Sequence, residues 1–225
     1  MIRSYTYFSI LLLLFTACGS PGSPSKDAPE AVLPPQDPTP VAAVKNIVFF
    51  GNSLTAGYGL ELSEAYPALI QHKIDSLHLP YKVINAGLSG ETTAGGNSRI
   101  TWILRQPVDI FVLELGANDG LRGLSLAETE KNLQQILDKV RAAYPNAKLM
   151  LAGMRVPPNM GKEYSDRFQG IFEKIAGHNK IAFLPFLLEG VGGEPVLNQA
   201  DGIHPTAEGQ KIVAENVWAI LKKLL

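Results

Sequence analysis

The sequence predicts an α/β protein whose fold is a three-layer α/β/α sandwich of flavodoxin-like type, built on a five-stranded parallel sheet. Five short runs of β-branched or other apolar residues have the character of buried strands, and longer amphipathic stretches separate them. Strands that alternate with helices are joined by right-handed crossovers, so the sheet is expected to be parallel and covered on both faces. The expected strands comprise residues 46–50, 82–85, 109–115, 148–152 and 181–184.

Two amphipathic stretches carry the clearest helical pattern. In residues 125–144, the apolar side chains of Leu133, Ile136, Leu137 and Val140 recur largely at helical spacing, while charged residues occupy the other faces. The stretch at the C-terminus repeats this pattern with Ile212, Val213, Val217, Ile220, Leu221 and Leu224. Both are therefore expected to be helices that cover the sheet.

The composition excludes several classes of protein. Hydrophobic residues make up 46% of the 225 residues and charged residues 18%, which is typical of a globular protein. Because 20 Lys and Arg balance 21 Asp and Glu, a nucleic-acid binder held by a basic field is disfavoured. The single cysteine excludes an intrachain disulfide and a cysteine-based metal cluster. We expect one domain over residues 45–225, with no metal and no cofactor.

The N-terminus has the features of an export signal. Arg3 precedes an apolar run over residues 8–15, and eight residues rise only about 12 Å as a helix, against roughly 30 Å of bilayer hydrocarbon. A cleavable signal over residues 1–17 is therefore favoured over a transmembrane anchor. The small residues before Cys18 resemble a bacterial lipobox, although Phe15 stands where the pattern usually has Leu. The alternative is a buried free cysteine in a core helix.

The segment that follows supports an anchored protein. Seven of the 16 prolines fall in residues 19–44, and proline suits neither a helix interior nor a sheet ladder. Residues 18–44 are therefore expected to be a lipidated Cys18 followed by an extended tether. The expected location is outside the cytoplasm, as a membrane-anchored lipoprotein in the periplasm or at the cell surface.

Polar residues follow the expected strands, at the edge where ligands bind in such sheets. Ser53 follows the first strand on a tight turn into a helix, where partial positive charge favours a developing anion. Its alternatives are a plain N-cap serine or a phosphate-binding turn, but the nucleotide fingerprints and a G-x-S-x-G elbow are missing from the chain. Gly90 follows the second strand, where a glycine leaves its N–H free to face a ligand, or lies in an ordinary loop. Asn118 follows the third strand, either as a donor to a developing oxyanion or as part of an ordinary Asn-Asp-Gly turn.

A histidine and an acid precede the C-terminal helix, in Asp201-Gly202-Ile203-His204-Pro205. Pro205 suits the first position of the helix and keeps His204 out of helical geometry. Asp201 is close enough in a bent loop to fix the tautomer of His204 and stabilise its charged form. We expect His204 to be the base and the remaining histidines to be solvated or capping residues: His72, His78 and His178.

Together these segments resemble the SGNH hydrolases, the family that contains the GDSL esterases and lipases. The four blocks read FFGNSLTAGYG, NAGLSGETT, ELGANDGLRG and DGIHP, and they span residues 49–205. The third block and the helix after it are most similar to the bacterial periplasmic group with esterase, thioesterase and lysophospholipase activity. The resemblance implies the SGNH hydrolase fold and a serine esterase that acts through an acyl-enzyme.

The resemblance also implies a role for each matched residue. Ser53 would be the nucleophile, His204 its general base and Asp201 the residue that orients His204. The oxyanion hole would comprise the backbone N–H groups of Ser53 and Gly90 and the side chain of Asn118. The sequence departs from the family at Asn52, where aspartate is usual. We expect Asn52 to affect the stability of the turn more than the chemistry.

Two segments after the fourth and fifth strands bear on the choice of substrate. Residues 153–161 and 186–196 are candidates for the wall of an acyl pocket, and within them we select Met154, Val156 and Pro157 as substrate-binding residues; the alternative is ordinary core or loop packing. The favoured substrates are small acyl esters or thioesters, including lysophospholipids. The alternatives are a carbohydrate or cell-envelope glycan O-acetylesterase with the same residues, and a non-catalytic binding lipoprotein. We expect a monomer that does not bind nucleic acid.

Overall fold

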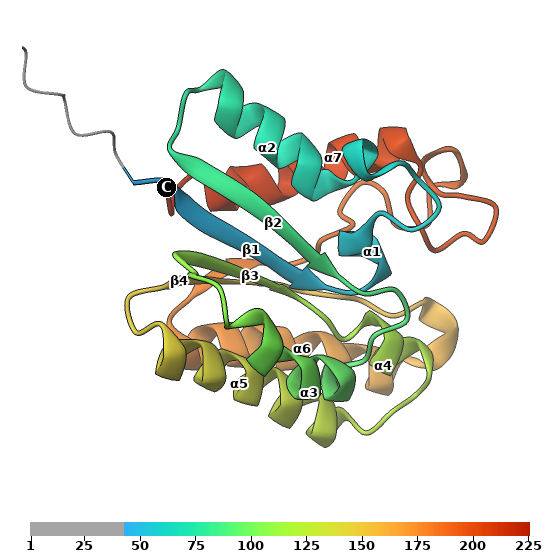
Figure 1. Cartoon of the computed structure of the whole chain (residues 1–225). Coiled ribbons are helices and arrows are strands. Elements are labelled where there is room, and N and C mark those ends of the chain that lie inside the picture. The colour runs from blue at the N-terminus through green and yellow to red at the C-terminus, as the bar shows by residue number, and fades with distance from the viewer. Residues whose placement is uncertain (1–42) are drawn as a thin grey trace, which may run out of the picture. The chain divides into compact units, whose positions relative to one another are not determined.

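The computed structural model describes residues 43–225, which form a five-stranded sheet with helices on both faces (Figure 1). All neighbouring strands are parallel, in the order β2-β1-β3-β4-β5. The order of the strands reverses at β1, which places a topological switch point at its carboxyl end. The strands are β1 (Lys45–Gly51), β2 (Tyr81–Gly87), β3 (Ile110–Glu114), β4 (Lys148–Ala152) and β5 (Ala182–Leu184).

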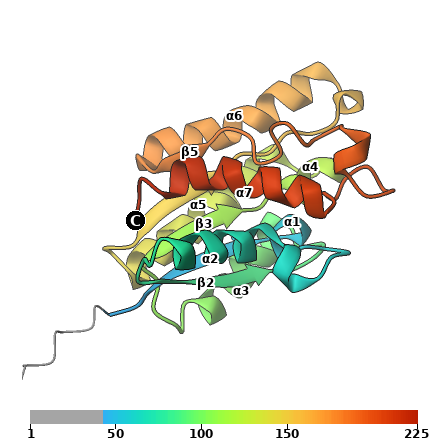
Figure 2. The ribbon, with the colours of Figure 1, turned by 90° about the horizontal axis from the view of Figure 1, so that it is seen from above.

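The helices form two layers. Helices α2 (Tyr66–Ser76) and α7 (Ala207–Leu221) lie together on one face of the sheet, as Figure 2 shows from above. Helices α3 (Thr93–Ile103), α5 (Leu126–Ala143) and α6 (Lys162–Asn179) cover the other face. The shorter helices are α1 (Ser53–Ala56), α4 (Ala117–Leu121), η1 (Leu62–Glu64), η2 (Pro158–Met160) and η3 (Pro195–Leu197). The prediction of a three-layer α/β/α sandwich with five parallel strands is therefore confirmed.

Burial accounts for the positions of these elements. The apolar stripe predicted on α5 is fully buried at Leu133, Ile136, Leu137 and Val140, and the other side of that helix carries charged residues. Strand β3 is buried along its whole length, as expected of a central strand covered on both faces. One residue of β3, Glu114, is an acid with 0% exposure at the carboxyl end of the strand. That acid lies at the edge of the sheet where Ser53 also lies.

The prediction for Pro205 was wrong. Helix α7 begins at Ala207, and its N-cap is Thr206, whose hydroxyl accepts a hydrogen bond from the N–H of Gly209 at 3.3 Å. Pro205 therefore lies before the cap, in an isolated antiparallel bridge with Asn198. A capping hydroxyl that satisfies an otherwise unpaired N–H of the first turn defines the start of the helix more strongly than the fixed φ of proline does.

Predictions for residues 1–42 fall outside the part of the chain that the structure describes. They are the signal over residues 1–17, the lipidated Cys18 and all but the last two residues of the tether over residues 18–44. Within residues 43–225, no helix combines the length and the apolarity needed to cross a bilayer. His72, His78 and His178, the histidines predicted to be solvated or capping residues, are all exposed.

Candidate active site

The side chains of Ser53, His204 and Asp201 form a continuous hydrogen-bonded chain. His204 Nε2 lies 2.8 Å from Ser53 Oγ, and His204 Nδ1 lies 2.7 Å from Asp201 Oδ2. Ser53 belongs to the turn after β1, whereas the other two residues lie in the loop before α7, about 150 positions later in the sequence. The structure therefore brings together the hydroxyl, the imidazole and the carboxylate that the sequence selected.

Asp201 is held by its own loop. Its Oδ1 accepts hydrogen bonds from the backbone N–H groups of Ile203 at 2.9 Å and His204 at 3.0 Å. These hydrogen bonds, first of all the one from the backbone of His204, lower the pKa of Asp201 to about 2. Because the carboxylate stays ionised at neutral pH, it accepts a hydrogen bond from the Nδ1–H group of His204 and leaves Nε2 facing the serine as an acceptor.

The loop around His204 is supported by residues that sequence reasoning missed. The N–H of Gln199 donates to the carbonyl of His204 at 2.7 Å, and its side-chain amide donates to the carbonyl of Tyr58 at 2.7 Å. The ring of Tyr58 lies against the imidazole, with 4.6 Å between the ring centroids. The first loop of the site therefore contacts the last, and nothing in the spacing of Tyr58 and Gln199 indicates this.

The turn that carries Ser53 depends on Asn52. Asn52 is the N-cap of α1, and its Oδ1 accepts a hydrogen bond from the N–H of Leu54 at 2.9 Å. Ser53 is the first residue of this helix, with 8% of its surface exposed. Its hydroxyl lies 3.5 Å from Asn52 Oδ1, a longer contact than the one to His204. The departure from the family pattern thus lies within the support of the serine.

Glu114 lies beneath the same turn and was also missed. Its carboxylate accepts hydrogen bonds from the Asn52 side chain at 2.7 Å, from the Asn52 backbone N–H at 3.1 Å and from the Thr55 hydroxyl at 2.7 Å. Complete burial raises the pKa of Glu114 to about 7, against the opposing effect of these donors. The sequence did contain a signal: an acid at the end of an otherwise apolar buried strand rarely occurs without partners.

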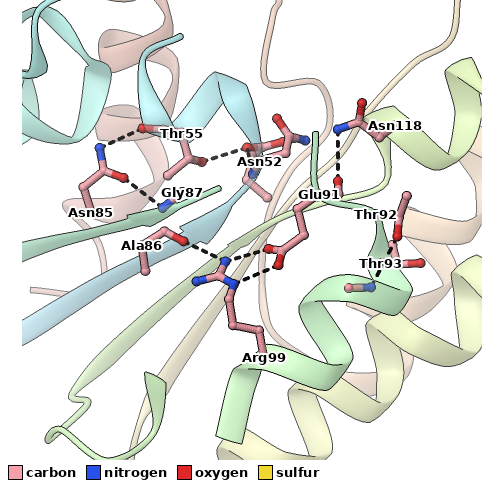
Figure 3. A network of polar contacts seen from close by, with 12 residues as sticks. Asn52, Thr55, Asn85, Ala86, Gly87, Glu91, Thr92, Thr93, Arg99 and Asn118 are labelled. Carbon is pink, nitrogen blue, oxygen red and sulfur yellow. Dashed lines mark hydrogen bonds and ion pairs between the residues drawn. The ribbon is translucent and has the colours of Figure 1, made fainter. Parts of the chain in front are cut away.

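The predicted oxyanion donors lie on the neighbouring loops. Asn118, on α4, donates a hydrogen bond to the carbonyl of Glu91 at 3.0 Å, which fixes the orientation of its amide (Figure 3). Within residues 43–225, the N–H groups of Ser53 and Gly90 donate no hydrogen bond to another group of the protein. Donors left unpaired by the protein are available to a bound ligand.

A buried ion pair supports the Gly90 loop. The Arg99 guanidinium contacts both carboxylate oxygens of Glu91, at 2.8 and 2.6 Å, and donates to the carbonyl of Ala86 at 2.9 Å (Figure 3). The guanidinium carbon also lies 4.3 Å from the centre of the Phe50 ring. Since Glu91 carries the carbonyl that orients Asn118, this pair links the core of the sheet to two of the predicted oxyanion donors.

The three candidate substrate-binding residues differ in exposure. Met154 and Val156 are 1% and 9% exposed and belong to the hydrophobic core, whereas Pro157 is exposed. Val156 packs near Gly120 and Phe168, where a Cβ on the glycine would meet both side chains. Met154 and Val156 therefore pack in the core and Pro157 is open to solvent, while the substrate-binding role of the three residues stays a prediction. No group of three or more potential metal ligands occurs among the described residues.

Known proteins share this sequence and fold. Esterase TesA from Pseudomonas aeruginosa is 41% identical over 188 residues, which cover 83% of this chain and 92% of that protein. Thioesterase 1/protease 1/lysophospholipase L1 from Escherichia coli K12 is 41% identical over 175 residues, which cover 77% of this chain and 82% of that protein. The solved structure of AlinE4, an SGNH-hydrolase family esterase, matches with a TM-score of 0.68 and 40% identity over 82% of this chain and 99% of that one.

A parallel α/β/α sandwich with a serine and a histidine in contact at its switch point is the architecture of a serine hydrolase. Residues 49–212 match the model of the GDSL-like lipase/acylhydrolase family, so the chain belongs to that family. It is a carboxylic-ester hydrolase of the serine-esterase class. The predictions of fold, family and enzyme class are confirmed.

Proposed function

We propose that Ser53 is the nucleophile of an acyl hydrolase that works through an acyl-enzyme. The observation that carries this proposal is the 2.8 Å contact between Ser53 Oγ and His204 Nε2, with Asp201 on the other nitrogen of the ring. As Ser53 Oγ attacks the carbonyl carbon of the substrate, Nε2 takes the hydroxyl proton. The resulting imidazolium is stabilised by the ionised Asp201.

The negative charge that develops on the carbonyl oxygen is stabilised by three donors: the N–H groups of Ser53 and Gly90 and the amide of Asn118. The two N–H groups make no other hydrogen bond within residues 43–225, and the amide of Asn118 is oriented by the carbonyl of Glu91. When the tetrahedral intermediate collapses, His204 returns its proton to the departing alkoxide or thiolate. Water then attacks the acyl-enzyme with His204 again as base, releasing the acid and restoring the Ser53 hydroxyl.

The proposed substrates are acyl esters and thioesters with short to medium chains, among them aryl or alkyl esters and lysophospholipids. The names of the relatives support this choice, since they include an esterase and a thioesterase/lysophospholipase. Rates on 4-nitrophenyl acetate, butyrate and octanoate, an acyl thioester, a lysophospholipid and an acetylated xylan test it. A pronounced preference for the xylan would instead establish a glycan O-acetylesterase.

The catalytic assignment is tested without any assumption about the substrate. A fluorophosphonate probe should label the wild-type protein at Ser53 and should not label the Ser53→Ala variant. A wild-type protein that resists the probe and hydrolyses none of these substrates would favour a non-catalytic binding lipoprotein.

We also propose that the protein is exported and anchored through Cys18 as a monomeric lipoprotein. Support comes from the apolar run over residues 8–15 and the proline-rich segment after the cysteine. The first described residues lie at the amino ends of the strands, opposite the edge that carries Ser53. Metabolic labelling with an alkyne fatty acid, with Cys18→Ser as control, tests the anchor, and light scattering of the detergent-solubilised chain tests the oligomeric state.

A further inference from the structure

Glu114 is the most deeply buried acid among residues 43–225, and it takes no direct part in the proposed reaction. It ends β3, in register with Gly51, the last residue of β1. A methyl group on Gly51 would lie 2.5 Å from Glu114 Oε2. Because Gly51 has no side chain, the Glu114 carboxylate has room to reach the turn that carries Ser53.

The donors around Glu114 are arranged so that each carboxylate oxygen has a defined partner. Oε1 accepts from Asn52 Nδ2, while Oε2 accepts from the Asn52 backbone N–H and the Thr55 hydroxyl. The Asn52 amide cannot be reversed without loss, because its oxygen already accepts from the N–H of Leu54. Asn52, the residue adjacent to Ser53, therefore presents two donors to Glu114, one from its side chain and one from its backbone.

We propose that Glu114 is a positioning residue for the Ser53 hydroxyl, and that asparagine at position 52 is the donor matched to the acceptor oxygens of Glu114. The inference rests on the proposed function, because it needs Ser53 to be the nucleophile. Glu114 holds Asn52 at two points, and Asn52 in turn caps α1 and precedes the serine. A displacement of about 1 Å in such a support is enough to cost roughly a hundredfold in rate.

The positioning does not depend on the charge of Glu114. When the carboxyl is ionised, the hydroxyl of Tyr66, 2.7 Å from Thr55 Oγ1, donates to Thr55, which donates to Oε2. A proton on Oε2 reverses these two hydroxyls and leaves both hydrogen bonds from Asn52 intact. The same geometry is therefore maintained on both sides of pH 7, where burial places the pKa of this carboxyl.

Substitution of Glu114 by glutamine should disrupt the match between the donors of Asn52 and the acceptor oxygens of residue 114. Glutamine has one acceptor oxygen and one NH2 group, so the NH2 group must face either the side-chain amide or the backbone N–H of Asn52, and both are donors. Asn52→Asp corrects the mismatch, because the new carboxylate accepts from the glutamine while the glutamine oxygen accepts from the backbone N–H and Thr55. The two exchanges together restore every donor–acceptor pair.

The test is a double-mutant cycle in the full chain, with wild type, E114Q, N52D and E114Q/N52D. We measure kcat, KM and the rate at which a fluorophosphonate labels Ser53. E114Q should lower kcat and the labelling rate roughly 10–100-fold with KM within about threefold, and the double variant should return to within about fivefold of wild type. The matched control is E173Q, which changes an exposed glutamate on α6 and should behave as wild type.

The N52D variant adds a pH signature that a general loss of stability would not produce. Two carboxylates at hydrogen-bonding distance share a proton, so the pKa of one of them is raised. The kcat of N52D relative to wild type should therefore fall as pH rises and recover as pH falls. In the double variant, which has a single carboxylate at this place, that additional pH dependence should disappear.

Several results would overturn the inference. They are a wild-type kcat and labelling rate in E114Q, or effects of the two substitutions that simply multiply in the double variant. If E114Q does not fold, the double variant decides, because the inference requires it to be folded and active. The Ser53→Ala variant distinguishes a failure of the proposed function from a failure of this inference. Turnover or labelling in Ser53→Ala would refute the proposed function. An inactive Ser53→Ala, together with effects of E114Q and N52D that are independent of each other, would refute only the role of Glu114.

Discussion

The two halves of the proposed triad are supported in different ways. The Ser53 turn stands on buried groups: Asn52 and Glu114 are both 0% exposed and hydrogen-bond across adjacent strands. The loop with Asp201 and His204 lies at the surface, where the side chain of Asp201 is 38% exposed and that of His204 18%. Asp201 is held mainly by N–H groups of its own loop, two and three residues away.

This difference indicates how stability and activity should separate. A carboxylate held by local backbone donors near solvent contributes little to the fold, so its loss should affect mainly the chemistry. A buried polar group whose partner is removed carries a large desolvation cost, so changes near the serine or its neighbouring loop should affect folding as well.

The largest expected effect is on kcat, from Asp201→Asn. Without the carboxylate, His204 loses the group that holds its tautomer and stabilises its charge, so kcat should fall roughly 10³–10⁴-fold. Because Asp201 is exposed, the melting temperature should change by no more than about 2 °C. Asp166→Asn, an exposed aspartate on α6, should leave both quantities unchanged. A large loss of stability in Asp201→Asn would contradict the comparison.

Asn118→Ala should have the next largest effect. Removal of one oxyanion donor costs about 10²–10³-fold in kcat, or roughly 3–4 kcal/mol, and KM should change little because the donor acts on the charge of the transition state. Steady-state kinetics on 4-nitrophenyl butyrate measures both constants. A rise in KM at constant kcat would show that Asn118 binds the ground state equally well, which is not the role proposed.

Arg99→Ala tests the buried support of the Gly90 loop. The substitution leaves the Glu91 carboxylate, whose side chain is 3% exposed, without its cation. Removal of one partner of a buried pair costs several kcal/mol; we expect about 3 kcal/mol, because Arg99 itself keeps 21% exposure. Urea unfolding measures this loss, with the exposed Arg105→Ala as a control within about 0.5 kcal/mol. Equal stabilities of the two variants would refute a supporting role for the pair.

The difference between the two halves also explains what the sequence could predict. Local spacing was sufficient for Asp201 and His204, because they lie three residues apart in one loop. The strands were predicted to within about two residues, since apolar runs mark them directly, and Ser53 and Asn118 followed from their places after strands. The family resemblance then joined these segments into one site.

Contacts across the sheet were not predictable in this way. The hydrogen bonds between Asn52 and Glu114 depend on the register of β1 against β3, which pairs residues more than 60 positions apart. Arg99 and Glu91 are eight positions apart, but their pairing depends on how α3 packs over β2. For Met154, an apolar residue after a strand fits a core and the wall of an acyl pocket equally well, so the sequence does not distinguish the two roles.

The carboxyl groups of Glu114 and Asp201 should make the stability of the fold depend on pH in opposite directions. The folded protein holds the proton of Glu114 up to about pH 7, whereas the unfolded chain releases it near 4.5. Between these values the folded state binds more protons, so the free energy of unfolding should fall as pH rises, by about 3 kcal/mol in total. Asp201 has the opposite sign: its stabilising contribution is present above 3.8 and is lost as pH falls toward 2.

These two windows do not overlap, so urea unfolding at pH 5, 6, 7 and 8 isolates Glu114. Wild type should lose stability from pH 5 to 7 and level off by pH 8, relative to E114Q, in which the group does not titrate. A wild-type stability that stays level between pH 5 and 7 relative to E114Q would mean that the donors from Asn52 and Thr55 outweigh burial and keep Glu114 ionised, because a carboxyl with a lowered pKa is ionised in both the folded and the unfolded state over this range.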